Sequence, residues 1–370
     1  MNNMDNHTLQ DYGWNEYWEQ VFSLQPPTIR QLSPARVVAQ FSHSYRVKTD
    51  AGEYSAGVSG KFEFYATKRG DYPAVGDWVA VETLPNERRA VIHAVLPRRT
   101  AMVRKAAGNT LDEQIVGANL DDLFIVNSLN QDFNLRKIER YLIAAWESGA
   151  RPVVLLTKAD LCEQPERFAA EVEQIAPGVP VHFVSALKEQ GIEALEPYLQ
   201  AGRTIGVTGS SGVGKSTLLN RLAGEPLQQT QHIREEDARG RHTTTHRELF
   251  LLKSGVLVMD TPGMRELQLW DSNEGWHHAF ADIEQLSLQC KYRDCKHESD
   301  PGCAVHEALL AGTLDAKRLA NYKKTARELS HLARKEMTAA SKAVKKTNRP
   351  KSGKALSRPN KRVYMYDGDE

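Results

Sequence analysis

The feature that most constrains the fold is a glycine-rich segment, GSSGVGKS, at residues 209–216. It fits the phosphate-loop pattern G-x-x-x-x-G-K-[ST], in which backbone N–H groups and a lysine surround phosphate oxygens. An apolar run at 204–207 precedes it and a helix-like pattern at 217–223 follows it, which is the context that the motif requires. A glycine-rich turn that arose by chance would lack these flanks. The segment therefore predicts an α/β domain with a nucleoside-phosphate site where one strand ends.

The residues of this loop have distinct expected roles. Lys215 would neutralise the β- and γ-phosphates, and the Ser216 hydroxyl would bind Mg²⁺. The glycines would let the backbone wrap closely around the phosphates. The residues expected to contact the nucleotide are Gly209, Ser210, Ser211, Gly212, Val213, Gly214, Lys215, Ser216 and Thr217.

A second phosphate-linked motif is LVMDTPG at 257–263, an apolar strand that ends in an aspartate and a turn. Asp260 is expected to hold the Mg²⁺, and the Gly263 N–H to sense the γ-phosphate. Between the two motifs, GRHTTT at 240–245 is expected to form a switch loop, in which Thr243 or Thr244 contacts the Mg²⁺ and the γ-phosphate. The threonine run could equally begin the next strand, at 247–252.

Guanine selection is predicted by TKAD at 157–160, which resembles N-K-x-D. The Asp160 carboxylate can accept both N1–H and N2–H of guanine, a donor pair that adenine lacks. The Lys158 stem can pack on the base face. Thr157 stands where asparagine is usual, which leaves one polar contact unassigned. Ser185 and Ala186, after the run VHFV, resemble the S-A-x loop that closes on the guanine edge.

The order of these motifs is unusual, because the guanine-reading segments precede the phosphate loop. This is the usual GTPase order with the chain cut at a different point. Circular permutation is tolerated when the original termini lie close together, since the same sheet can still form. The apolar runs 123–127, 152–156 and 204–207 alternate with helical patterns at 135–148, 166–176 and 190–200, which predicts a mostly parallel sheet.

A cluster of cysteines and one histidine follows this domain: Cys290, Cys295, His297 and Cys303. Three thiolates and one imidazole at this spacing are the ligand set of a closed structural Zn²⁺ site, one per chain. Free cysteines buried in a helical module are the plain alternative. His306 could compete with His297 as the fourth ligand.

The rest of the 370-residue chain divides into further segments. Five β-like runs at 36–41, 44–49, 61–67, 77–82 and 90–96 favour a small barrel, with an OB-fold as first interpretation and a β-domain without ligand as alternative.

Residues 98–117 are interpreted as an interdomain connector. The expected order is a weakly ordered N-terminal arm at 1–34, the OB-fold at 35–100, the permuted domain at 101–275, a helical zinc-binding domain at 276–335 and a basic disordered tail at 336–370. The tail suits a phosphate-rich polymer or merely solubilises the chain.

The polar, acidic N-terminal residues do not resemble a secretory signal, so we do not expect secretion. We also expect no membrane helix, because no window of the sequence holds the roughly 18–20 apolar residues that one needs. Three of the four cysteines cluster beside histidines, which favours metal binding over a disulfide framework. We expect a cytoplasmic monomer with no membrane partner.

Taken together, TKAD, GSSGVGKST, GRHTTT, DTPG and the C-x₄-C-x-H-x₅-C cluster resemble the circularly permuted GTPases of small ribosomal subunit biogenesis called RsgA or YjeQ. The resemblance runs from about residue 35 to 335. It implies an OB-fold, a permuted GTPase domain and a zinc domain. It also implies hydrolysis of GTP to GDP and phosphate, stimulated by the small (30S) subunit and its rRNA during late maturation.

The sequence predicts the nucleotide-binding residues, but it does not identify the residue that orients the attacking water during hydrolysis. Met264 and Arg265 follow Gly263, so the glutamine that orients water in Ras-like enzymes is absent and slow intrinsic hydrolysis is expected. His242 could orient the attacking water, or it could be a loop histidine that faces RNA or solvent. Two other functions stay open: a P-loop ATPase or RNA kinase, and a nucleotide-gated RNA-binding protein with incidental hydrolysis.

Overall fold

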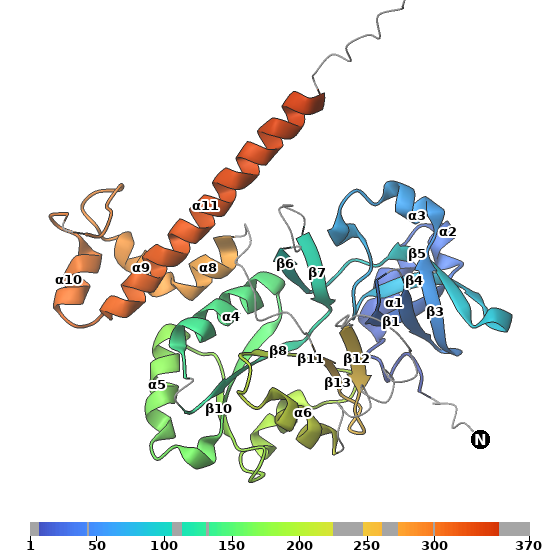
Figure 1. Cartoon of the computed structure of the whole chain (residues 1–370), viewed down its shortest axis with the longest axis horizontal. Coiled ribbons are helices and arrows are strands. Elements are labelled where there is room, and N and C mark those ends of the chain that lie inside the picture. The colour runs from blue at the N-terminus through green and yellow to red at the C-terminus, as the bar shows by residue number, and fades with distance from the viewer. Residues whose placement is uncertain are drawn as a thin grey trace, which may run out of the picture.

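Three bodies make up the chain in the computed structural model: a β-barrel, an α/β sheet and a helical module (Figure 1). The structure describes residues 7–42, 44–105, 113–130, 133–224, 247–260, 273–298 and 300–347. No helix in these ranges is long and apolar enough to cross a bilayer.

The barrel is built from β1 (Ser33–Gln40), β2 (Tyr45–Thr49), β3 (Gly52–Val58), β4 (Trp78–Leu84) and β5 (Arg89–Val95). Hydrogen bonding runs in the order β1-β2-β3-β5-β4, and an additional β1–β4 pairing closes the ring. Closure removes exposed sheet edges, as in OB-folds. The barrel predicted from the short β-like runs is therefore confirmed, with its core formed by inward-facing valines and isoleucine, Val37, Val47, Val79, Val81 and Ile92.

The prediction of a third strand at residues 61–67 is wrong, because these residues belong mostly to helix α3 (Gly60–Tyr65). Ser59 caps this helix, its Oγ accepting a hydrogen bond of 3.1 Å from the Phe62 N–H. Such a cap favours a helix start over an extended segment. The third strand is instead the glycine-containing GEYSAGV of β3, whose composition masks its strand character.

The prediction of a weakly ordered arm at 1–34 is also wrong, because residues 7–32 pack on the barrel and residues 33 and 34 begin strand β1. Residues 7–32 contain α1 (Glu16–Ser23) and α2 (Pro27–Arg30). Trp14 and Trp18 are buried, with ring centroids 4.8 and 5.9 Å from that of Trp78. Large aromatic rings supply most of the apolar area that holds this segment in place.

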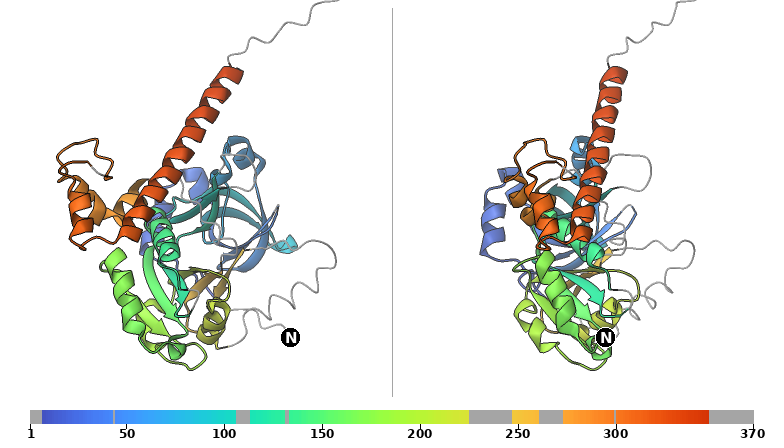
Figure 2. Two further views of the ribbon diagram at one scale, coloured as in Figure 1. Left: turned by 60° about the vertical axis from the view of Figure 1, so that its left-hand side comes forward. Right: turned by 90° about the vertical axis from the view of Figure 1, so that its left-hand side faces the viewer.

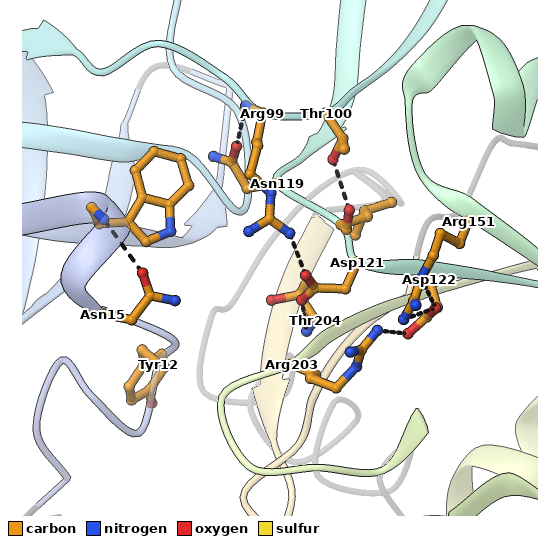
Figure 3. A network of polar contacts seen from close by, with 12 residues as sticks. Tyr12, Asn15, Arg99, Thr100, Asn119, Asp121, Asp122, Arg151, Arg203 and Thr204 are labelled. Atoms are coloured by element: carbon orange, nitrogen blue, oxygen red, sulfur yellow. Dashed lines mark hydrogen bonds and ion pairs between the residues drawn. The ribbon is translucent and has the colours of Figure 1, made fainter. Parts of the chain in front are cut away.

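Residues 98–117 are not a connector but lead into a hairpin of β6 (Ala101–Lys105) and β7 (Glu113–Ala118). The basic start of this segment is structural. Arg98 forms an ion pair of 2.7 Å with the fully buried Asp77. Arg99 pairs with Asp121, which also accepts a hydrogen bond from the Thr204 N–H (Figure 3).

The α/β domain contains β8 (Asp122–Ser128), β9 (Arg151–Thr157), β10 (Val181–Val184), β11 (Thr204–Gly209), β12 (Arg247–Leu251) and β13 (Leu257–Asp260). The order is β10-β9-β8-β11-β13-β12, parallel except for β12. Helices α4 (Leu135–Ser148) and α5 (Pro165–Ile175) pack into one core cluster, and α6 (Lys215–Ala223) packs into the other. The helix expected at 190–200 is a 3₁₀ segment, η4 (Glu193–Tyr198), with Pro197 inside it.

Barrel and α/β domain share one continuous sheet, because β12 also pairs with β1. The antiparallel register joins Ala39 to Glu248 and Gln40 to Arg247. Next to this junction the Arg36 guanidinium is buried and donates to Tyr12 O at 2.6 Å, Gly76 O at 3.1 Å and Thr204 Oγ1 at 3.0 Å. The first half of β1 thus closes the barrel, and its end extends the neighbouring domain.

The C-terminal module contains α8 (Asn273–Ala279), α9 (Ala281–Ser287), α10 (Ala304–Leu310) and α11 (Ala316–Thr347). The start expected for the disordered tail is wrong, since α11 continues through residues 336–347. The sequence from 316 to 349 has no glycine or proline to end a helix. The far part of α11 projects away from the body of the molecule in all the views of Figures 1 and 2.

Candidate functional site

The predicted nucleotide-binding segments meet at one edge of the sheet. In the parallel ladder Val184 is level with Thr157, Thr157 with Ser128, and Gly209 with Val126. The loops after β10, β9, β8 and β11 therefore leave the same edge. Ligands of open α/β sheets bind outside the carboxyl ends of the strands, so this edge is the expected place for a nucleotide.

The phosphate loop has backbone angles that require glycine. Gly212 and Gly214 have φ of 78° and 94°. A Cβ built on Gly209 would lie 2.2 Å from the Val126 carbonyl oxygen. Helix α6 begins at Lys215, so the N–H groups of its first turn point toward the loop. This is the strand–loop–helix arrangement that the sequence predicts, with Ser216 and Thr217 in the first turn.

The lysine of the motif folds over its own loop. Lys215 Nζ donates to the carbonyl oxygens of Gly209 at 2.8 Å and Ser210 at 2.6 Å. An ammonium held by neutral carbonyl oxygens can exchange these partners for phosphate oxygens. The arrangement keeps the positive charge at the phosphate-binding position.

Thr157 links the base-reading loop to the phosphate loop. Its buried hydroxyl lies 2.6 Å from the carbonyl oxygen of Val213, to which it donates. At the position where asparagine is usual, the threonine thus makes a polar contact to the backbone of the phosphate loop. A threonine reaches it because the end of β9 lies close beside that loop.

Lys158 and Asp160 follow directly. Lys158 has φ of 57°, a left-handed conformation that turns the chain sharply out of β9. Asp160 is exposed in the short 3₁₀ segment η3 (Ala159–Leu161), where its carboxylate is accessible to a ligand.

The neighbouring loop after β10 is closed by a bridge between Ser185 and Gln190, with backbone hydrogen bonds of 2.9 and 3.1 Å. Ser185 Oγ accepts from the Lys188 N–H at 3.2 Å. Gly191 follows, and a Cβ there would lie 2.0 Å from Phe183 O. Ala186 is half-buried against the core. The sequence pattern did not single out Gln190 or Gly191, although the glycine between two strands was a usable signal.

Part of the predicted site lies outside the described residues. This applies to His242, Thr243, Thr244 and Gly263. The backbone of Asp260 is among the described residues: it is the last residue of β13 and lies level with Val207. The side chain of Asp260 is outside the description. Its backbone position puts it next to the strand that leads into the phosphate loop.

The cysteine cluster is brought together in the C-terminal module. The ligand atoms of Cys290, Cys295, His297 and Cys303 all lie within 4.8 Å of one another. His297 Nδ1 is 3.6 Å from the sulfurs of Cys290 and Cys303, which are 3.9 Å apart. Tetrahedral Zn²⁺ at ~2.3 Å from sulfur and ~2.0 Å from nitrogen places sulfurs ~3.8 Å apart and sulfur and nitrogen ~3.5 Å apart. The geometry therefore fits a closed zinc site.

The surroundings of His297 fix which nitrogen faces the cluster. Its Nε2 lies 3.1 Å from Ser287 Oγ, which itself donates to Ile283 O at 2.8 Å. Nε2 therefore carries the proton and Nδ1 is left for a metal. Burial lowers the pKa of His297, with Lys323 as a second cause, which favours the neutral ligating form. His306 does not join the cluster; its backbone N–H donates to Cys303 Sγ at 3.3 Å.

The helical module is attached to helix α4 of the α/β domain. Arg318 of α11 forms ion pairs of 2.7 Å with Glu139 of α4 and with Asp282 of α9. Asn321 donates to the other Glu139 oxygen. Burial raises the pKa of Glu139, and Arg318 opposes this shift. The ring of Trp146 on α4 also stacks on His278 of α8.

The fold and the site define a circularly permuted P-loop nucleotide-binding protein with a barrel before the α/β domain and a Cys₃His module after it. A family profile described as RsgA GTPase matches residues 95–270. A second profile, ABC transporter, matches residues 192–349, a stretch that contains the phosphate loop shared by different nucleotide-binding classes.

Curated relatives cover most of the chain. The small ribosomal subunit biogenesis GTPase RsgA 1 of Listeria innocua is 44% identical over 331 residues, 90% of this chain and 92% of that protein. The RsgA of Opitutus terrae is 44% identical over 89% of this chain and 91% of its own. The chain belongs to the RsgA GTPase family, as its motifs indicated.

Two solved structures are similar to this chain over most of its length. The crystal structure of YjeQ from Thermotoga maritima has a TM-score of 0.59 at 29% identity, covering 80% of this chain and 98% of that one. YloQ, described as a circularly permuted GTPase, has a TM-score of 0.57 at 23% identity, covering 83% and 98%, and so shows the shared fold.

Proposed function

We propose that this chain binds the small (30S) ribosomal subunit and hydrolyses GTP there to GDP and phosphate, in late maturation of that subunit. As a member of the RsgA family the chain is a GTPase. The names of its curated relatives place those proteins in small-subunit biogenesis. The barrel before the nucleotide domain and the zinc module after it are the surfaces proposed to contact rRNA.

The observation that carries the GTP assignment is the hydrogen bond from Thr157 to the Val213 carbonyl. It joins a loop that ends in Lys158 and Asp160 to a loop that holds Lys215. A guanine on the Asp160 carboxylate and a triphosphate on Lys215 would then belong to one ligand. A base other than guanine would leave that carboxylate unpaired, and this is the source of the expected selectivity for guanine.

Magnesium fits the oxygen ligands offered at this edge. Ser216, in the first turn of α6, and Asp260, at the end of β13, are proposed to hold Mg²⁺ together with phosphate oxygens. When bound, the ion would neutralise charge on the β- and γ-phosphates. Thr243 or Thr244, Gly263 and His242 keep their proposed roles at the γ-phosphate and the attacking water.

Zinc is proposed as the second metal, with a structural role. The donor set has four protein ligands and leaves no open position for substrate, so the ion would stabilise the fold of the module rather than catalyse a reaction. We further propose a cytoplasmic, monomeric protein. The basic residues beyond 347 would add affinity for rRNA phosphates.

The central experiment measures GTP turnover by the full chain with and without purified small subunits. We expect slow turnover alone and a large increase with subunits, which large subunits do not reproduce. Equal GTP turnover alone, with small subunits and with large subunits would refute the proposal that the small subunit is the partner.

Base selectivity separates this function from a P-loop ATPase or RNA kinase. With Asp160→Ala we expect GDP affinity to fall and the preference for guanine over adenine nucleotides to collapse, while Lys158→Ala keeps the preference. ATP and GTP competing equally for the wild-type site would favour the ATPase.

A nucleotide-gated RNA-binding protein with incidental hydrolysis remains the other candidate. Subunit affinity would be compared with GDP and with a non-hydrolysable GTP analogue. Affinity that is the same with both nucleotides would contradict any switch, whereas nucleotide-dependent affinity with release only after hydrolysis would support the proposed enzyme.

A further inference from the structure

A second lysine reaches the phosphate loop from outside its motif. Lys137, in the first turn of α4, has its Nζ 3.1 Å from the Ser210 hydroxyl oxygen. The Lys215 ammonium lies 2.6 Å from the carbonyl oxygen of the same Ser210. Two ammonium groups thus converge on one residue of a loop whose backbone is shaped to surround an anion.

The position of Lys137 is electrostatically unfavourable for α4 itself. The first turn of this helix contains Arg136 and Lys137 and no acidic residue. Helix N-termini favour negative charge, because unsatisfied N–H groups give that end a partial positive charge. A cation placed there is stabilised when an anion lies nearby, and Lys137 lies beside the phosphate loop.

The start of α4 is held in place from two directions. Asn134 caps the helix, its side-chain oxygen accepting from the Lys137 N–H at 3.1 Å. Glu139, two residues further along, is buried and paired with Arg318 of the C-terminal module. The backbone that carries Lys137 is therefore fixed, and only its exposed side chain has to turn from Ser210 to a ligand.

We propose that Lys137 is a second phosphate-contacting cation of the GTP site, which moves from the Ser210 hydroxyl to an oxygen of the terminal phosphate when GTP is bound. This inference rests on the proposed function, because it assumes GTP on the loop. Lys137 supplies positive charge at the end of the triphosphate, where charge rearranges during transfer to water. Its sequence position, 73 residues before Ser210, hides it from any motif search.

The test uses the full chain and compares affinities for GDP and for guanylyl imidodiphosphate, a non-hydrolysable GTP analogue. For Lys137→Ala we expect the analogue to bind about tenfold more weakly, with GDP much less affected, because a charge-assisted contact to the terminal phosphate is lost. Lys137→Arg should recover most of the affinity. Arg136→Ala, which removes the same charge one position away, is the matched control and should bind both ligands within about twofold of wild type.

Two outcomes would overturn the inference. One is Lys137→Ala binding both ligands as wild type does. The other is Ser210→Ala reproducing the Lys137→Ala defect, which would mean that Lys137 only holds the loop. Lys215→Ala tests the proposed function separately: if it kept wild-type affinity for both guanine nucleotides, the GTP site itself would be wrong.

Discussion

The barrel and the C-terminal module are attached to the α/β domain by different physical means. The barrel is joined through the backbone, because β1 extends the sheet at β12, and through the buried Arg36, which donates to Thr204. The module rests on the side of one helix, α4, through Arg318, the stacked rings of Trp146 and His278, and an apolar cluster that includes Ile143. Backbone pairing depends little on side-chain identity, whereas an attachment made by side chains depends on which residues are present. The module junction should therefore be the more fragile of the two.

The largest effect is expected inside the module, with Cys295→Ser. Structural zinc contributes on the order of 10–16 kcal/mol in small zinc domains, and one lost thiolate removes much of that. We expect loss of bound zinc and rapid hydrogen exchange of residues 281–310, with GDP affinity within about twofold of wild type. Metal analysis and exchange mass spectrometry measure both.

Cys162→Ser is the matched control, since Cys162 lies outside the cluster and should keep one zinc per chain. Retention of stoichiometric zinc by Cys295→Ser would contradict the ligand assignment.

Next comes the attachment itself, in Arg318→Met. Removing the arginine leaves Glu139 buried without its charged partner, at a cost of about 3–5 kcal/mol. Burial already raises the pKa of Glu139 above its usual value, and loss of Arg318 should raise it further. The folded state then favours the protonated acid, so the defect should be smallest at acid pH and grow as pH rises through the folded pKa.

Adding Glu139→Gln to Arg318→Met should restore part of the stability and remove this pH dependence. The readout is the difference in unfolding free energy between variant and wild type from pH 5 to 8. A defect that does not change with pH would show that Glu139 is not the group left unpaired.

On the barrel side, Arg36→Met should cost less, about 2–4 kcal/mol. It removes the hydrogen bonds to the Tyr12 carbonyl and the Thr204 hydroxyl, but the β1–β12 ladder stays. Urea unfolding measures the change, with the exposed Arg89→Ala as control. A loss larger than that of Arg318→Met would reverse the comparison.

The smallest effect is expected for Arg46→Ala, about 1–2 kcal/mol, because Arg46 is partly exposed while its partner Glu248 is buried. Arg46 of β2 pairs with Glu248 of β12 across the same junction, but it is partly exposed. If backbone pairing holds the barrel, this ion pair adds little. A loss of several kcal/mol would mean that side chains hold this junction as well.

Sequence reasoning succeeded where chemistry dictates local geometry. The helix expected at 135–148 is α4, and the phosphate loop lies between its strand and helix. The sequence-based prediction failed where one segment fits both a strand pattern and a helix pattern. The aromatics of 61–67 fit a strand or one helical turn, and Ser59 decided for the helix.

Other features depend on contacts between distant parts of the chain. Trp14 and Trp18 pack on Trp78 from a distant part of the chain, and no local period predicts that contact. Similarly, TKAD pointed to the base, but only the structure shows that Thr157 reaches Val213. The ion pair between Glu139 and Arg318 joins residues 179 positions apart.

The geometry of α11 gives its junction with α4 mechanical leverage. This helix has 32 residues, and its ion pairs with α4 lie at its third residue, Arg318, and at its thirteenth, Glu328, which pairs with Arg140 at 3.4 Å. The part of α11 beyond Glu328 extends for about 28 Å at 1.5 Å per residue, so a tilt of about 5° moves the tip by about 2.5 Å. A rotation of α4 too small to disturb the sheet would become a displacement longer than a covalent bond at the far end.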